Sequence, residues 1–350
     1  MTKQLHHLKG LFLVLVSLTA FQQPLAAQDI LFTDYNRTPL QINPALTGNF
    51  DGKVRLLAGY RSQSSEVLRG DSYNANFISV DTKVLETEKQ AFGLGLSGWR
   101  DVSGELNFGS RSLNLSASYH RKFASSGRVD HKLMIGVEGG IAERRIDFGG
   151  TRFIPQYDRI IDFDVNSLID NSTTEINGGF VWQADFANGN AFYIGVAAHH
   201  LSGYIVIVTQ RGNRGNGVPL TVRYSVNGAG EFHLSETWKI LPSFLFLEQG
   251  GYDALTLGAS IRKTFGDRYS RKYIQIGLFG RASSEDSIGV VSDGGFFNIN
   301  LNLKRFSLGL TFEGSSNDLR QAGSFDSAAE ITLGYIFGRQ VLQNVVPIKD

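Results

Sequence analysis

Residues 297–303 alternate strictly between an apolar residue and asparagine. Because successive side chains of a β-strand point to opposite faces, such a strand has one apolar face and one amide face. The same alternation returns in residues 113–120, 255–261 and 306–312. Strands of this kind fit two all-β architectures: a soluble sandwich with its apolar faces packed together, or a closed barrel with apolar residues facing lipid around a polar lumen.

The start of the chain favours the barrel. Lys3 and Lys9 precede an apolar run over residues 11–21, and small residues follow up to Ala27, as in a secretory signal peptide. We therefore expect a signal peptide over residues 1–27. No other stretch approaches the roughly 18 continuous apolar residues of a membrane helix. The expected product is an exported, transmembrane antiparallel β-barrel of the outer-membrane type.

Composition agrees with this expectation and excludes several functions. The 40 glycines, 25 phenylalanines and 12 tyrosines suit many strands, tight turns and aromatic girdles. The absence of cysteine excludes disulfides, thiolate catalysis and thiolate metal sites. A net charge of +1 provides no field to attract nucleic acid, so nucleic acid is not an expected partner.

Alternation and turn residues predict about 14 strands between residues 53 and 337. The predicted strands cover residues 53–63, 72–83, 90–101, 107–123, 131–143, 173–186, 190–201, 218–235, 238–248, 252–265, 271–282, 294–303, 305–314 and 327–337. Connections after even strands are brief, whereas those over residues 144–172, 202–217, 283–293 and 315–326 follow odd strands and are longer; residues 249–251 are the exception.

This parity predicts the orientation, because bacterial barrels have an even strand number, short periplasmic turns and long outer loops. We expect a bacterial outer-membrane location with both termini in the periplasm. The predicted organisation is a signal peptide (1–27), a periplasmic N-terminal segment (28–52), a barrel (53–337) and a periplasmic tail (338–350). The N-terminal segment is expected to cap the lower rim or to fold into the lumen as a plug.

One outer loop resembles a calcium site in part. Asp162, Asp164 and Asn166 begin like an EF-hand loop, but Ser167 and Thr173 stand where glycine and a bidentate glutamate belong. We expect a solvated acidic loop, with a looser calcium site as the alternative, and no metal otherwise.

Other motifs have simpler explanations than catalysis. Residues 93–98 match a dinucleotide fingerprint by letters, but they lie inside an alternating strand, where glycines allow curvature. Ser118 and His120 share a lumen face, yet no motif marks an oxyanion hole. His199 and His200 are adjacent, so in a strand they face opposite sides and belong to an interfacial belt. No enzyme activity and no cofactor are expected.

Several segments carry a more specific signal. They are Gln28, Asp29, Phe32, Thr33, Tyr35, Pro39, Leu40 and residues 43–48 near the start, residues 60–63 and 144–148 within the chain, and residues 330–337 at the end of the last strand. With these segments the chain resembles the PorP/SprF family of type IX secretion and gliding-motility outer-membrane proteins of Bacteroidota. The resemblance covers essentially the whole mature chain.

The resemblance implies a noncatalytic outer-membrane component that assists export or surface anchoring of a secreted adhesin. Its implied partners are outer-membrane lipid, a periplasmic peptidoglycan-linked lipoprotein, the type IX machinery and the adhesin itself. A diffusion porin or hydrophobic-substrate channel is the alternative, and a barrel enzyme is a third hypothesis.

Two segments are candidate partner-binding sites. The first comprises Asn43, Pro44, Ala45 and Gly48, and the second comprises Ile205, Val206, Ile207 and Val208. The turn formed by the first segment either presents a fixed shape to a periplasmic partner or serves as the rim or plug. The second segment either forms an exposed apolar contact patch or prolongs strands above the membrane.

Overall fold

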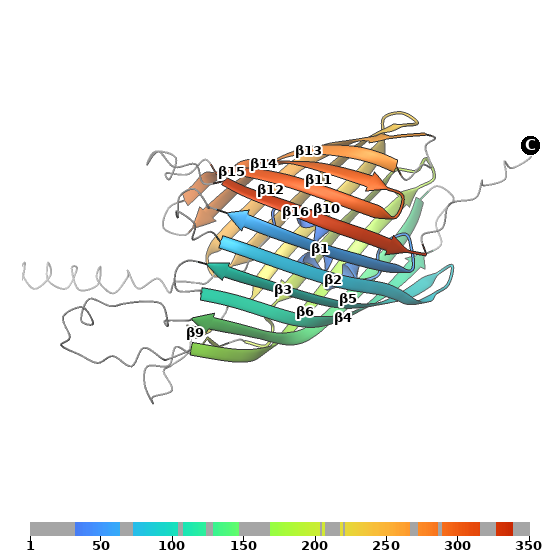
Figure 1. Ribbon diagram of the computed structural model, residues 1–350. Coiled ribbons are helices and arrows are strands. Elements are labelled where there is room, and N and C mark those ends of the chain that lie inside the picture. The colour runs from blue at the N-terminus through green and yellow to red at the C-terminus, as the bar shows by residue number, and fades with distance from the viewer. Residues whose placement is uncertain are drawn as a thin grey trace, which may run out of the picture.

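The structure, a computed structural model, describes residues 32–63, 73–103, 108–123, 129–146, 169–203, 205–206, 218–219, 221–266, 272–285, 289–315 and 327–338. Within these residues fourteen antiparallel strands form a closed barrel (Figure 1). The strands are β1 (Val54–Gln63), β2 (Tyr73–Glu86), β3 (Gln90–Ser103), β4 (Phe108–Phe123), β5 (Val129–Ile146), β6 (Ile169–Phe186), β7 (Ala191–His199), β10 (Arg223–His233), β11 (Trp238–Gln249), β12 (Tyr252–Thr264), β13 (Lys272–Glu285), β14 (Gly289–Leu303), β15 (Phe306–Ser315) and β16 (Ser327–Phe337). The barrel closes where β1 pairs with β16.

The predicted fold, an antiparallel barrel of about 14 strands, is therefore confirmed. Several boundaries differ from the sequence-based expectation; for example, the predicted loop 144–172 is shorter at both ends, because β5 runs to Ile146 and β6 begins at Ile169. The predicted strand over residues 218–235 contains two elements, because β9 (Val218–Pro219) pairs with β8 (Ile205–Val206) in a separate ladder and β10 begins only at Arg223. The predicted loop 283–293 is mostly strand, since β13 runs to Glu285 and β14 starts at Gly289.

The two faces of the wall are chemically opposite to those of a soluble protein. In β4, Leu115 is 68% exposed on the outside, whereas its neighbour Ser116 is buried in the lumen. In β14, Phe297 faces outward while Asn298 and Asn300 are buried. Apolar residues outside and polar residues inside are the pattern of a barrel in lipid.

Connections differ at the two ends of the barrel. Residues 87–89, 187–190, 234–237 and 304–305 join β2–β3, β6–β7, β10–β11 and β14–β15 at one end, here called the turn end. Val54, the first residue of β1, and Phe337, the last residue of β16, pair with each other at this end. At the opposite, loop end, the predicted exception is confirmed: Gly250 and Gly251, both with positive φ, join β11 to β12 directly.

The lumen is not empty. Residues 32–49, here called the plug, contain the short helices η1 (Tyr35–Arg37), α2 (Pro39–Ile42) and η2 (Pro44–Leu46) and lie inside the barrel (Figure 1). None of the described helices is long and apolar enough to cross a membrane.

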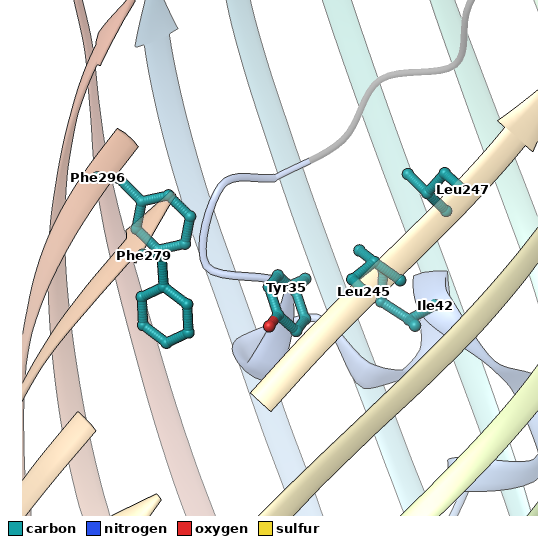
Figure 2. Close-up of a cluster of buried hydrophobic side chains, with 6 residues drawn as sticks. All are labelled: Tyr35, Ile42, Leu245, Leu247, Phe279 and Phe296. Carbon is teal, nitrogen blue, oxygen red and sulfur yellow. The ribbon is translucent and has the colours of Figure 1, made fainter. Parts of the chain in front are cut away.

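Apolar contacts hold the plug to three separate parts of the wall. Tyr35 and Ile42 of the plug form a buried cluster with Leu245 and Leu247 of β11 and with two stacked rings from β13 and β14 (Figure 2). A second cluster joins Ala45 and Leu46 to Met134 and Val181. A third packs Phe32 against Ala75 and Phe77. The protein's small apolar core therefore lies at the interface between plug and wall.

Candidate functional site

The plug begins at a network of buried charges. The backbone N–H of Thr33 donates to Oε2 of Glu330 at 2.8 Å, and its hydroxyl donates to Oε2 of Glu313 at 2.6 Å. Arg61 pairs with the same carboxylate oxygen at 2.9 Å, and Arg281 pairs with the other. Since buried charges require partners, these cations fix the position of Glu313, and with it the start of the plug.

Asp34 is buried in the amide ladder of β14. Its Oδ2 accepts hydrogen bonds from the side-chain amides of Asn298 at 2.9 Å and Asn300 at 3.3 Å. Burial raises the pKa of the Asp34 carboxyl above its usual range, while Arg37 and the two amides act in the opposite direction. Desolvation thus disfavours the charged form of this side chain.

The middle of the plug is fixed by Asn43, which is fully buried. Its Nδ2 donates to the backbone carbonyls of Phe180 at 3.3 Å and Val196 at 3.1 Å. Its Oδ1 accepts from the N–H of Ala45 at 3.0 Å and so caps helix η2. A Cβ atom at Gly179 would lie 2.0 Å from this oxygen, so the wall needs glycine there.

The last carbonyls of α2 are satisfied by the wall at the loop side. The carbonyl of Ile42 accepts from the hydroxyl of Ser225 at 3.2 Å and lies 3.2 Å from Nε2 of His199. The carbonyl of Gln41 accepts from Nη2 of Arg223 at 3.2 Å. Carbonyls at a helix end lack intrahelical donors, so these side chains stabilise the buried α2.

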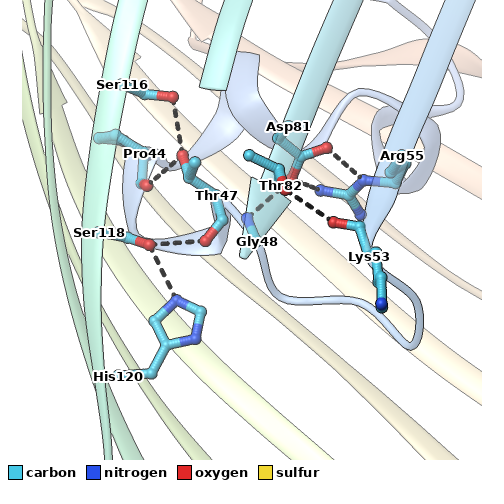
Figure 3. A network of polar contacts seen from close by, with 10 residues as sticks. All are labelled: Pro44, Thr47, Gly48, Lys53, Arg55, Asp81, Thr82, Ser116, Ser118 and His120. Atoms are coloured by element: carbon cyan, nitrogen blue, oxygen red, sulfur yellow. Dashed lines mark hydrogen bonds and ion pairs between the residues drawn. The ribbon is translucent and has the colours of Figure 1, made fainter. Parts of the chain in front are cut away.

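The end of the plug is bound to β4 and β2 (Figure 3). The hydroxyl of Thr47 donates to Oγ of Ser116 at 2.9 Å, and its carbonyl accepts from the hydroxyl of Ser118 at 2.6 Å. Oγ of Ser118 lies 3.0 Å from Nε2 of His120. The predicted shared lumen face of Ser118 and His120 is therefore present, and it faces the plug.

Gly48 then turns the chain out of the lumen with φ of 73°. Its N–H donates to Oδ2 of Asp81 at 2.7 Å, and Asp81 also accepts two hydrogen bonds from Arg55 at 2.9 and 2.7 Å. A Cβ atom at Gly93 would lie 2.4 Å from the carbonyl oxygen of Thr47. Plug and wall backbones approach too closely here for any other residue type.

The first predicted partner-binding segment lies entirely in the plug. Asn43, Pro44, Ala45 and Gly48 are all buried against the wall. A partner would reach them only after the plug leaves the lumen, and binding at these residues stays a prediction.

The remaining predicted site residues lie near or beyond the limits of the described chain. Ile205 and Val206 form β8, whereas Ile207 and Val208 lie outside the described residues. The calcium candidates Asp162, Asp164 and Asn166, the signal peptide and the tail beyond Gly338 also lie outside them. Across the described ranges, no group of three or more His, Asp or Glu side chains is arranged to hold a metal ion.

The prediction for His199 and His200 was wrong. Both side chains are buried in the lumen, instead of belonging to an interfacial belt. The reason is that His200 leaves the strand conformation with φ of 61°, which turns it to the same side as its neighbour. Its Nδ1 lies 3.3 Å from Oε1 of Glu175.

Sequence reasoning missed the acidic residues that receive the plug. Asp81, Glu313 and Glu330 occupy inward positions of β2, β15 and β16. Their positions in the sequence could have revealed them, because alternation assigns these acidic residues to the lumen face. A carboxylate buried in a narrow, filled lumen requires a hydrogen-bond or charge partner.

These features define a class: an outer-membrane β-barrel of fourteen strands whose lumen is filled by its own N-terminal segment. The family model described as "Type IX secretion system membrane protein PorP/SprF" matches residues 25–335. The chain therefore belongs to the PorP/SprF family. No curated protein matches the sequence.

Solved structures with a similar outline are outer-membrane barrels of low identity. The toluene transporter TbuX of Ralstonia pickettii has 10% identity and a TM-score of 0.46, over 86% of this chain and 94% of that one. The toluene transporter TodX of Pseudomonas putida has 9% identity and a TM-score of 0.45, over 85% and 92%. CdiB from Escherichia coli has 10% identity and a TM-score of 0.45, over 81% and 63%. At these values the likeness concerns the outline of the barrel alone and carries no statement about function.

Proposed function

We propose that this protein is a noncatalytic outer-membrane barrel of the type IX secretion and gliding machinery. It assists the export or the surface anchoring of a secreted adhesin-like protein and contacts a periplasmic, peptidoglycan-linked lipoprotein. Family membership supports a place in the type IX machinery. The plugged lumen is the structural observation that supports a role other than conduction.

The plug supports this role because it spans the lumen. Its side chains and backbone hydrogen-bond to β1, β2, β4, β6, β7, β10, β11, β14, β15 and β16. A diffusion porin or hydrophobic-substrate channel requires an open path through the barrel. A lumen fastened on so many sides is better suited to a fixed scaffold whose outer surfaces bind partners.

The environment of Ser118 supports a noncatalytic role. Its hydroxyl is committed to the carbonyl of Thr47, and the described residues place no carboxylate in hydrogen-bond contact with His120. A serine nucleophile needs a base that a third group orients and an oxyanion hole beside it.

We assign the turn end to the periplasm. Short connections lie there, as in bacterial barrels, and both limits of the barrel, Val54 and Phe337, lie at the same end. In this assignment the short turns and the C-terminal tail serve periplasmic partners, and the connections between β5 and β6 and between β7 and β10 serve the secreted protein.

The deciding experiment is deletion of the gene followed by analysis of surface proteins. We expect the loss of one surface-displayed protein, restored by the intact chain, and copurification of the barrel with a periplasmic lipoprotein. An unchanged surface proteome would refute the proposed role.

A second measurement separates the scaffold from a channel. In planar bilayers the intact barrel should conduct poorly, and a variant lacking residues 32–49 should conduct well. High conductance of the intact protein would favour the porin instead.

A further inference from the structure

A cavity of about 510 Å³ lies between the end of the plug and the wall at the turn end. Its lining includes Asn49 and Phe50 from the plug side, Thr87 beside the β2–β3 turn and Leu241 from β11. This cavity, here called the vestibule, has a volume typical of small-molecule sites. It plays no part in the function proposed above.

One row of the vestibule wall carries facing charges of the same sign. Lys122 of β4 is directly opposite Lys132 of β5, and Lys132 is directly opposite Gln183 of β6. All three residues line the vestibule and are here called the polar rung. Directly opposed like charges destabilise a sheet, because their Cβ atoms are only about 5 Å apart. The barrel maintains this arrangement without a compensating carboxylate in the row.

The carboxylates of Asp185 and Glu86 act on Lys132 electrostatically, but neither reaches it as an ion-pair partner. Neither Lys122 nor Lys132 forms an ion pair with a described carboxylate, and the hydrogen bond of Lys132 Nζ goes to the neutral amide oxygen of Asn49 at 2.8 Å. That amide in turn donates to Oε1 of Gln183 at 3.4 Å. The plug thus holds the rung in position without neutralising it.

The acidic residues of the vestibule are occupied elsewhere. Glu86 pairs with Lys83 at 2.9 Å. Glu231, on the far wall, pairs with Lys239 at 2.5 Å and with Arg262 at 2.7 Å. Asp51 also has an interaction of its own. The charges left over on the lining are the two ammonium groups of the polar rung.

We propose that the polar rung binds a phosphate group. A phosphate offers several acceptor oxygens and more than one negative charge, so one group can accept hydrogen bonds from both ammonium groups and relieve their repulsion. Phe50, Phe192 and Leu241 line the same cavity and suit the apolar part of a phosphate-bearing lipid. Free phosphate shares the recognised chemistry, and the experiment below distinguishes the two sources.

The test uses the full chain, purified in a nonionic detergent and titrated calorimetrically. The probes are short-chain phosphatidylglycerol, inorganic phosphate and hexaglutamate. Lys122→Gln with Lys132→Gln should weaken binding of the phosphate probe by about tenfold or more, since two charged hydrogen-bond donors are lost. The matched control is Arg121→Gln, which removes an exposed charge from the outer face of the same strand and should bind as the original chain does.

Tighter binding of the lipid than of inorganic phosphate assigns a lipid headgroup, and equal binding assigns free phosphate. The proposal would be overturned if the original chain, the double variant and the Arg121→Gln control bound the probes with equal affinity. It would also be overturned if neither phosphate probe bound, or if hexaglutamate bound more tightly than they did. A thermal scan without ligand gives an independent check. Because the facing lysines repel each other, the double variant should unfold at the same temperature as the original chain or higher, and a lower temperature would identify the rung as structural instead.

Discussion

The backbone N–H of Gly48 and the carboxylate of Asp81 meet at 2.7 Å, at the point where the plug leaves the lumen. Asp81 is almost fully buried and is held in turn by Arg55, whose side chain is 12% exposed. The plug is therefore fastened at its exit by a charged acceptor that the wall itself holds in place.

Asp81→Asn should loosen this exit. Hydrogen bonds to charged groups contribute about 1.5–3 kcal/mol, so the open plug should become roughly tenfold more populated or greater. Because the chain has no cysteine, Leu46→Cys provides a single reporter thiol whose reaction with a water-soluble maleimide measures opening. Glu88→Gln removes an exposed charge from the nearby turn and should leave the reaction rate unchanged. Equal rates in all three backgrounds would contradict the assigned role of Asp81.

Gly136→Ala should be destabilising because the plug passes directly over this residue. A Cβ atom at Gly136 would lie 2.3 Å from the backbone nitrogen of Ala45, and overpacking of this kind costs about 1–3 kcal/mol. At Gly139, in the same strand, the nearest atom would be 3.9 Å away, so Gly139→Ala should be nearly neutral. Thermal unfolding in detergent tests the pair, and equal melting temperatures would contradict the close contact.

Asp34 should make stability depend on pH. Its folded-state pKa is raised above the ordinary value of 3.8, so the folded protein holds this proton more tightly than the unfolded chain does. The resulting stabilisation is present at low pH and is lost as pH rises through the raised folded pKa. Asp34→Asn should therefore reduce the loss of stability as pH rises above the ordinary pKa of 3.8, whereas Asp130→Asn, at an exposed position, should not. An unchanged pH profile in the Asp34 variant would refute this.

Ser118→Ala should affect the plug and not any chemistry. Loss of its 2.6 Å hydrogen bond to the carbonyl of Thr47 should cost about 1 kcal/mol of stability. Lipid hydrolysis by the purified barrel should be absent before and after the substitution. A hydrolytic activity that disappears in Ser118→Ala or His120→Ala would contradict the noncatalytic proposal.

The wall could be predicted from sequence because lipid imposes a strict period of two. The alternation around Asn298 and Asn300 places these amides on the lumen face, where the structure has them buried. The short Gly250–Gly251 turn was also visible, since two glycines between alternating runs indicate a tight hairpin. Strand ends beyond the membrane, such as Glu285 of β13, are less constrained, and there the prediction erred.

The contacts of the plug could not be predicted in this way. Asn43 meets Phe180 and Val196 across large sequence separations, and no local pattern encodes such a meeting. His200 illustrates a different failure, because a single positive φ reversed the side that alternation had assigned. The opposed pair of Lys122 and Lys132 required the register between two strands, which depends on the exact length of their connection.

The seam between β1 and β16 adds a consequence for assembly. Thr33, near the entrance of the plug, finds its acceptor on Glu330 of β16, the final strand to be synthesised. The hydrogen bond between Thr33 and Glu330 therefore joins the first described residues of the chain to its last strand. The contact that fastens the first residues of the plug therefore depends on the same strand that completes the wall.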